Sequence, residues 1–227
     1  MQAPFNDGAF LFYATRLFLN MHNIFRQFIE GIQQTSWLEF IAVIAGIASV
    51  WFSRLENILV YPVGLINTII YIFISIKGHL YGEASVNLYY TIVSIYGWIL
   101  WAKKDEQKQH VLSVTFSSSK EWMQQLLFFA SFYIVIFLSL SYLKINFAPG
   151  AIPWADAFAS STAYTGMWLM AKKKVESWYW WIATDFASIP LYFVKGYVFT
   201  SFQFMLFTTL AIWGLFEWFK KAKALRP

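Results

Sequence analysis

The sequence has no cysteine and few charged residues. Only 13% of its 227 residues are Asp, Glu, Lys or Arg, whereas soluble globular proteins contain about 25%. Without cysteine, the chain can form neither a disulfide bond nor a cysteine-based metal site. The three histidines, His22, His79 and His110, lack the spacing of a metal motif. We therefore expect no bound metal and no cofactor.

Catalytic signatures are missing as well. The sequence contains no glycine-rich phosphate loop and no nucleophile elbow. We therefore expect a protein that is not an enzyme and does not hydrolyse ATP. The N-terminus also lacks the basic segment and small-residue site of a cleaved signal peptide.

Apolar and aromatic residues are abundant instead, at 59% and 22% of the chain. A surface with so little charge does not suit water, so the composition predicts an all-α integral membrane protein. The net charge of +5 comes from clusters of basic residues between apolar runs. This pattern indicates membrane topology rather than binding to nucleic acid.

Seven apolar runs approach the roughly 20 residues that a membrane-spanning helix needs. They lie at about Trp37–Phe52, Ile58–Ile76, Ser85–Ala102, Trp122–Leu143, Trp154–Met170, Trp178–Val194 and Tyr197–Phe219. Before them, residues 10–32 have helical apolar spacing broken by polar residues, which predicts an amphipathic helix in the membrane interface.

The basic residues orient the seven predicted spans. Twelve of the 17 Lys and Arg residues fall on one side, mainly in the clusters 103–104, 172–174 and 220–223. The positive-inside rule makes this side cytoplasmic, so we expect a cytoplasmic C-terminus.

The sequence also repeats itself weakly at an offset near 120 residues. Segments 54–57, 77–81 and 97–104 match segments 174–177, 195–197 and 214–221. We expect an N-terminal segment (1–35), a three-helix bundle (36–104), a loop with a linker helix (105–145) and a second bundle with a basic tail (146–227). An odd helix between two such bundles makes them parallel repeats, and transporters of this kind bind substrate between the repeats. The alternative is chance similarity between apolar helices.

A polar and aromatic stripe runs along the sixth apolar run. Its members, Trp178, Trp181, Asp185, Ser188 and Tyr192, are three or four residues apart and share one helical face. Indole faces attract a flat or cationic ring, and a carboxylate inside a span usually faces a cavity or a partner. We expect this stripe to bind a small-molecule ligand. The alternative for Trp178 alone is an anchor at the membrane interface.

Other spans carry further candidate binding residues. They are Asn67, Tyr71, Asn87, Tyr90, Thr91 and Gln203. Carboxamides both donate and accept hydrogen bonds, so they suit an amide or sugar hydroxyls. The alternative for the two asparagines is hydrogen bonding between helices. Glu56 and Glu176 lie close to basic residues, and we expect salt bridges or loop anchors there.

These motifs resemble the PnuC family of vitamin transporters. The resemblance covers about residues 37–221 and rests on WLEFIAV at 37–43, Glu56-Asn57 with YPVG at 61–64, SIYGW at 94–98, and ESW at 176–178 with the rest of the stripe. It implies uptake of nicotinamide riboside, a cationic pyridinium linked to ribose, by facilitated diffusion across a bacterial inner membrane. A cytoplasmic kinase would trap the substrate by phosphorylation. Related members carry thiamine or riboflavin.

The resemblance also implies a fold and a site. The fold would be similar to that of the SWEET sugar carriers, with two three-helix bundles joined by a linker helix, and a homotrimer is a family-level expectation. The family's Trp-x-x-Trp motif corresponds to Trp178 and Trp181, and its polar positions correspond to Asn67, Asn87 and Tyr90.

Overall fold

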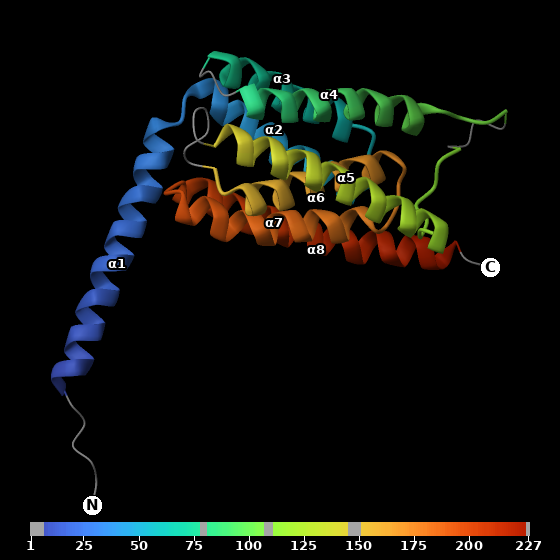
Figure 1. The fold of residues 1–227 in the computed structure, drawn as a ribbon. Helices are drawn as coiled ribbons and strands as arrows, with labels where there is room; N and C mark the ends of the chain where they lie inside the picture. The colour runs from blue at the N-terminus through green and yellow to red at the C-terminus, as the bar shows by residue number, and fades with distance from the viewer. Residues whose placement is uncertain (1–6, 78–80, 107–110, 145–150, 226–227) are drawn as a thin grey trace, which may run out of the picture.

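The computed structural model describes residues 7–77, 81–106, 111–144 and 151–225 (Figure 1). Most of these residues belong to eight α-helices. They are α1 (Asp7–Gln34), α2 (Trp37–Arg54), α3 (Val60–Lys77), α4 (Tyr81–Ala102), α5 (Ser119–Leu143), α6 (Pro153–Ala171), α7 (Ser177–Val194) and α8 (Val198–Ala224). His79 and His110 lie outside the described residues.

The predicted all-α class is confirmed, and helices occupy all seven positions predicted for spans, with ends only a few residues from those expected. By length and composition, four of the described helices, α2, α3, α5 and α8, could cross a membrane. Other helices of the bundle carry buried polar side chains. In α6, for example, Ser161, Thr162 and Thr165 are buried, and each hydroxyl donates to a backbone carbonyl of its own helix. This is the pattern of a multi-pass membrane protein with its polar side chains turned inward.

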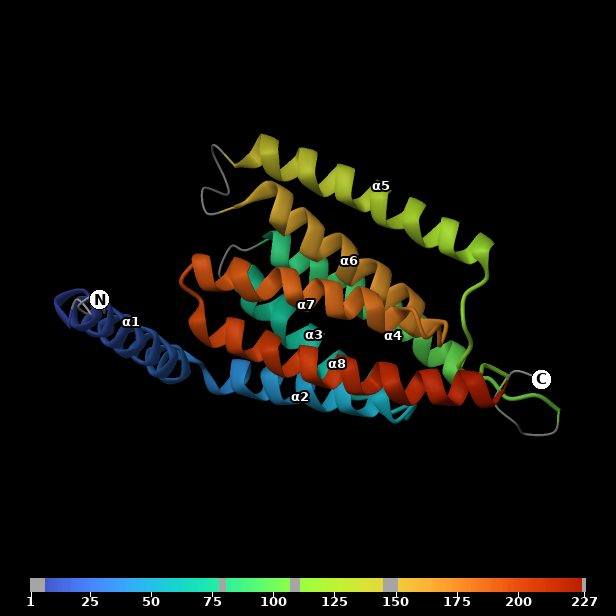
Figure 2. The ribbon, with the colours of Figure 1, turned by 90° about the horizontal axis from the view of Figure 1, so that it is seen from below.

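Six helices form a closed ring. In the order α2, α3, α4, α6, α7 and α8, each helix contacts the next, and α8 contacts α2 again. The ring therefore joins α2–α4 to α6–α8 at two places, α4 with α6 and α8 with α2. Helix α5 packs on the outside against α6 (Figure 2).

Helix α1 extends away from this bundle at a steep angle (Figure 1). It contacts α8 near its own C-terminal end, where the ring of Phe28 lies 5.6 Å from that of Phe199 and 5.1 Å from that of Phe202. The predicted N-terminal helix is therefore present and is attached by one aromatic contact region.

Local sequence signals explain where several helices begin. Ser36 caps α2 by accepting a hydrogen bond from the backbone of Glu39. Ser118 and Glu121 form a reciprocal capping box at the start of α5. These caps satisfy backbone donors that have no partner within the first turn.

One end of the ring carries Arg54, Lys173, Lys174 and Lys221, and we refer to it as the basic end. The segment before α5 crosses this end and pairs with the turn between α6 and α7, since Thr115 and Lys174 form an isolated β-bridge. Glu176 accepts hydrogen bonds from the backbone and the hydroxyl of Ser117, at 2.9 and 2.7 Å. The prediction that Glu176 anchors a loop is thus confirmed.

Contacts at the basic end recur in two sets of positions 117 residues apart. Tyr61 packs edge-on to Trp101 and close to Gly97. In the same way, Trp178 packs edge-on to Trp218 and close to Gly214. The indole N–H of Trp101 donates to Ala171 at the end of α6, and that of Trp218 donates to Ser53 and Arg54 at the end of α2.

The same separation relates two turns. Glu56, after α2, and Lys173, after α6, are the described non-glycine residues with positive φ, at 59° and 53°. They also form an ion pair with each other at 2.6 Å. In the structure the two halves therefore correspond at an offset of 117 residues rather than about 120. By its turn geometry, Glu56 corresponds to Lys173 and not to Glu176.

Candidate functional site

Trp178 lies in the packed aromatic core of the basic end. It is 1% exposed, and its ring centroid lies 5.5 Å from that of Trp218. A Cβ atom added at Gly214 would lie 2.5 Å from the Trp178 ring, so the two helices meet closely here. The indole N–H of Trp178 is buried and has no hydrogen-bond partner among the described residues. In this conformation its faces are covered by protein.

Trp181 lies one turn further along α7 and faces a different set of helices. Its ring packs on Gly166 of α6, where an added Cβ would lie 3.3 Å from it. Its centroid lies 6.3 Å from that of Tyr90 on α4. Trp181 is only partly buried. It therefore connects the two halves of the ring through aromatic contact without being fully covered.

A group of tyrosines continues this surface. The ring of Tyr164 on α6 lies 4.3 Å from that of Tyr89 and 6.1 Å from that of Tyr90. The hydroxyl of Tyr89 donates to the backbone carbonyl of Tyr164 at 2.9 Å. Together with Trp181, these rings line the region where α4, α6 and α7 meet.

Asp185 is the most unusual residue of the stripe. Its side chain is 3% exposed, and it forms no hydrogen bond or ion pair with another described residue. The direction of Asp185 around α7 falls between those of Trp178 and Trp181, since seven residues are about 20° short of two full turns. Trp178 faces α8 and Trp181 faces α6 and α4. Asp185 therefore points into the ring.

The far end of the stripe is separate from its beginning. Ser188 is buried, and Tyr192 stacks on Phe204 of α8 with centroids 5.3 Å apart. Trp178 and Tyr192 are 14 residues apart, or about 21 Å along a helix. The structure thus places the five stripe residues on one face, but Trp178 and Tyr192 cannot both touch one small ligand.

The side-chain amides of the two asparagines donate to backbone carbonyls, one in a neighbouring helix and one in its own helix. The Asn67 amide donates to the carbonyl of Ala42 on α2 at 2.7 Å. The Asn87 amide donates to the carbonyl of Glu83 in its own helix at 2.9 Å. For Asn67, the hydrogen bond between helices that we considered as an alternative is the observed one, although its acceptor oxygen is not used in a hydrogen bond to another described residue.

The hydroxyl of Thr91 donates a hydrogen bond to the hydroxyl oxygen of Thr68 on α3, at 2.9 Å. Tyr71 and Gln203 are partly buried. Neither residue contacts Trp181 through an aromatic or hydrogen-bonding interaction in the described part of the chain.

The basic end is closed by ion pairs as well as by aromatic rings. Glu56 binds Lys173 at 2.6 Å and Lys221 at 3.1 Å, and Arg54 binds Glu217 at 3.0 Å. Burial would raise the pKa of Glu56, but the hydrogen bonds and charges of Lys173 and Lys221 outweigh burial and hold that pKa below its usual value. The predicted salt bridge of Glu56 is therefore confirmed.

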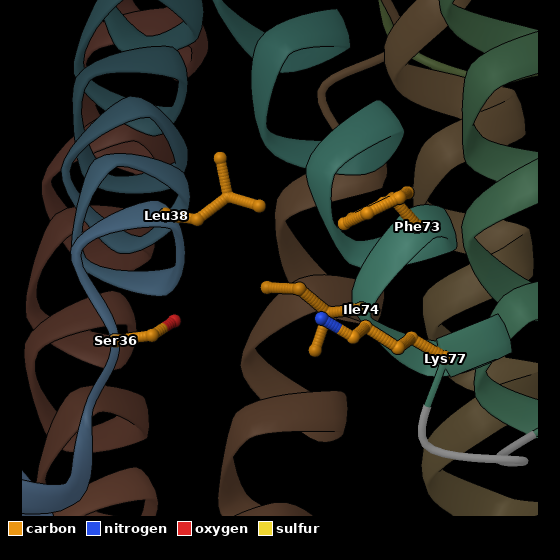
Figure 3. Close-up of a pocket in the computed structure, with 5 residues that line it drawn as sticks. All are labelled: Ser36, Leu38, Phe73, Ile74 and Lys77. Carbon is orange, nitrogen blue, oxygen red and sulfur yellow. The ribbon is translucent and has the colours of Figure 1, made fainter.

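A pocket of about 420 Å³ lies at the opposite end of the bundle, between the start of α2 and the end of α3 (Figure 3). It is lined by Ser36, Leu38, Phe73, Ile74 and Lys77. None of these was predicted to bind a ligand, and the pocket is mostly apolar. Figure 3 shows the Lys77 side chain reaching toward Ser36 across the opening.

Sequence reasoning missed Tyr164 and Gly166. Both lie in a run of small and hydroxyl-bearing residues at 159–166, most of which are buried. Such a run inside a span indicates close helix packing. A single large tyrosine within it was the available signal that this helix also contributes an aromatic surface.

Comparison with known proteins identifies the family. A family model described as nicotinamide mononucleotide transporter matches residues 36–220. The nicotinamide riboside transporter PnuC of Escherichia coli is 24% identical over 213 residues, covering 85% of this chain and 89% of that protein. The chain belongs to the PnuC family of vitamin transporters. Residues 1–35 lie outside the match, as the sequence resemblance implied.

The relatives of this chain are named for more than one vitamin. The riboflavin/roseoflavin transporter RibM of Streptomyces davaonensis is 24% identical over 201 residues, covering 86% of this chain and 91% of RibM. The nicotinamide riboside transporter PnuC of Neisseria mucosa is 27% identical over 204 residues, covering 83% and 74%. Membership of the family therefore indicates vitamin transport without fixing the vitamin.

A solved structure supports the fold. The crystal structure of the vitamin B3 transporter PnuC superposes with a TM-score of 0.68 and 21% identity, covering 91% of each chain. The arrangement of helices in this chain is thus one that a PnuC-family transporter adopts.

Proposed function

We propose that this protein carries nicotinamide riboside across a bacterial inner membrane by facilitated diffusion. The observation that carries the proposal is the Trp181–Tyr90 pair, which lies between the two halves of the ring and beside the small residue Gly166. A flat aromatic ligand at this place would contact both halves at once. Carriers use such a position because movement of one half against the other then exposes the ligand to either side.

The proposed topology has seven spans, α2 to α8, in two parallel repeats joined by α5 in the manner of the SWEET carriers. The recurrent contacts at a separation of 117 residues support this, since Tyr61 and Trp101 correspond to Trp178 and Trp218. The positive-inside rule assigns the basic end and the C-terminus to the cytoplasm. We also propose that a cytoplasmic kinase phosphorylates the delivered substrate. The family resemblance further suggests that the protein forms a homotrimer.

Stacking predicts how the nicotinamide ring would be held. A desolvated cation–π contact contributes about 2 kcal/mol, so Trp181→Ala should weaken binding about 30-fold. Polar side chains would form hydrogen bonds with the ribose or the carboxamide, through donors and acceptors that the helix contacts do not use. We propose this role for Asn67, Asn87, Thr91 and Gln203. Trp178 would take part only in a conformation in which the basic end has opened.

Calorimetry on the purified protein tests this placement. We expect nicotinamide riboside to bind the wild type and to bind Trp181→Ala much more weakly. Tyr179→Ala is the matched control, because Tyr179 lies on the same helix but is exposed on its outer face. Equal affinity of wild type and Trp181→Ala would contradict the site.

Riboflavin and thiamine are the rival substrates, and the similarity to RibM gives riboflavin a specific basis. Titration of the three vitamins side by side decides among them. Uptake into proteoliposomes with the preferred vitamin then tests transport itself, since a membrane protein that only binds a partner would show none.

A further inference from the structure

Asp185 is a buried carboxylate that forms no ion pair with any basic side chain of the described residues. An ionised carboxylate in a low-dielectric environment is strongly unfavourable unless it is paired or hydrogen-bonded. Yet Asp185 is 3% exposed and has no hydrogen bond or ion pair among the described residues. Such a residue inside a span points to a ligand or a functional partner rather than to stabilisation of the fold.

The nearest cations along the chain are already engaged. Lys195 lies ten residues later, about 15 Å along a helix, and binds Asp156 at 2.6 Å. On the other side, Lys173 binds Glu56 at 2.6 Å and Lys174 binds Glu121 at 2.7 Å. The basic side chains closest to Asp185 along the chain are therefore paired with other carboxylates, and a positively charged ligand would complement Asp185.

The position of Asp185 relates it to the proposed aromatic site. Asp185 lies four residues after Trp181, so the two side chains are neighbours on one face of α7. Thr184, on the adjacent face, is held by Thr162 of α6 at 2.9 Å, which fixes the rotation of α7 against α6. Asp185 is thereby kept pointing into the ring, beside the surface formed by Trp181 and Tyr90.

We infer that Asp185 is a specificity-determining residue that selects a positively charged aromatic ring over a neutral ring of the same shape. The inference rests on the proposed function and adds a substrate class to it: the pyridinium form of the nicotinamide ring is bound, and its neutral dihydropyridine form is rejected. Stacking alone tolerates both, because each presents a ring of similar size to Trp181. The carboxylate discriminates, because only the pyridinium supplies the missing positive charge.

The test compares nicotinamide riboside with its reduced form, dihydronicotinamide riboside, on full-length protein in detergent. We expect the wild type to bind the oxidised form at least tenfold more tightly. Asp185→Asn should remove most of this preference by weakening the oxidised ligand, while the affinity for the reduced form changes less than about threefold. Asp185→Glu keeps the charge and should keep the preference.

Glu106→Gln is the matched control, because it also removes one negative charge but from an exposed site in the segment after α4. Where Asp185→Asn does not fold, Asp185→Ser takes its place. A preference that survives loss of the carboxylate overturns the inference. Equal binding of the two forms by the wild type overturns it as well and leaves the proposed function standing. A wild type that binds neither form contradicts the proposed function instead.

Discussion

The ion pair between Glu56 and Lys173 offers the sharpest test of how the basic end is held together. Its two members differ in their surroundings. The Lys173 side chain is 5% exposed, whereas that of Glu56 is 22% exposed and has a second partner in Lys221. Removing one member should therefore be much more harmful than removing the other.

Glu56→Gln leaves the Lys173 ammonium buried without its counter-charge. Breaking a buried pair in this way costs about 3–5 kcal/mol. The ammonium also lies 4.6 Å from the centroid of the Trp101 ring, which offsets about 1 kcal/mol. We expect a net loss of about 2–4 kcal/mol in the free energy of unfolding. Lys173→Met removes the buried charge itself and leaves Glu56 with Lys221, so its cost should be about 1 kcal/mol or less.

Thermal unfolding of the detergent-purified protein measures the difference. For a chain of this size, Glu56→Gln should lower Tm by about 5–15 °C, and Lys173→Met by much less. Lys174→Met is the control, because its partner Glu121 is 37% exposed and the pair contributes little. If Lys173→Met is as destabilising as Glu56→Gln, the asymmetry argued from burial is wrong.

Three further outcomes follow from the same structure. The pKa of Glu56 is held below its usual value. The stability that Glu56 adds is therefore present above about pH 4.5 and is lost as pH falls through the lower folded-state pKa. The Tm difference between wild type and Glu56→Gln should vanish at acidic pH, and a constant difference would contradict this. Gly214→Ala should cost about 1–3 kcal/mol by overpacking, because its Cβ would meet the Trp178 ring; an unchanged Tm would show that α7 and α8 can separate freely. Deleting residues 1–30 should leave ligand binding within about twofold, because α1 touches the ring through α8 near Phe28; loss of binding would give α1 a role in the site.

Helix positions were predictable because membrane spans have a strong signal in composition and length. The side-chain contacts inside the ring were less predictable. Helical periodicity correctly placed Trp178 and Trp181 on one face, but it carries no information about depth. The first of these rings is covered by Trp218 and Gly214, residues far away in the sequence. Which aromatic ring stays accessible depends on the partner helix, and the sequence of α7 alone does not contain that partner.

The pairing of charges at the basic end shows a similar limit. The sequence indicated that Glu56 would form a salt bridge, since basic residues crowd this end. It did not indicate Lys173 as the partner, which is 117 residues away. The pairing follows from two turns with the same positive φ facing each other. Only the packing of the two halves brings them together.

The separation of 117 residues also bears on why Asp185 is present. Its counterpart in the first half is Thr68, whose hydroxyl is paired with that of Thr91. The counterpart of Trp181 is Gly64, which packs against Ser49. The first half thus fills these two places with a small residue and a satisfied hydroxyl, so the ring architecture does not itself require an indole or a carboxylate there. An indole and an unpaired carboxylate, one turn apart on the second half alone, are better explained by a ligand that is aromatic and positively charged. The first half of the ring packs without a buried carboxylate, so packing alone does not account for the electrostatic cost of Asp185 in the second half.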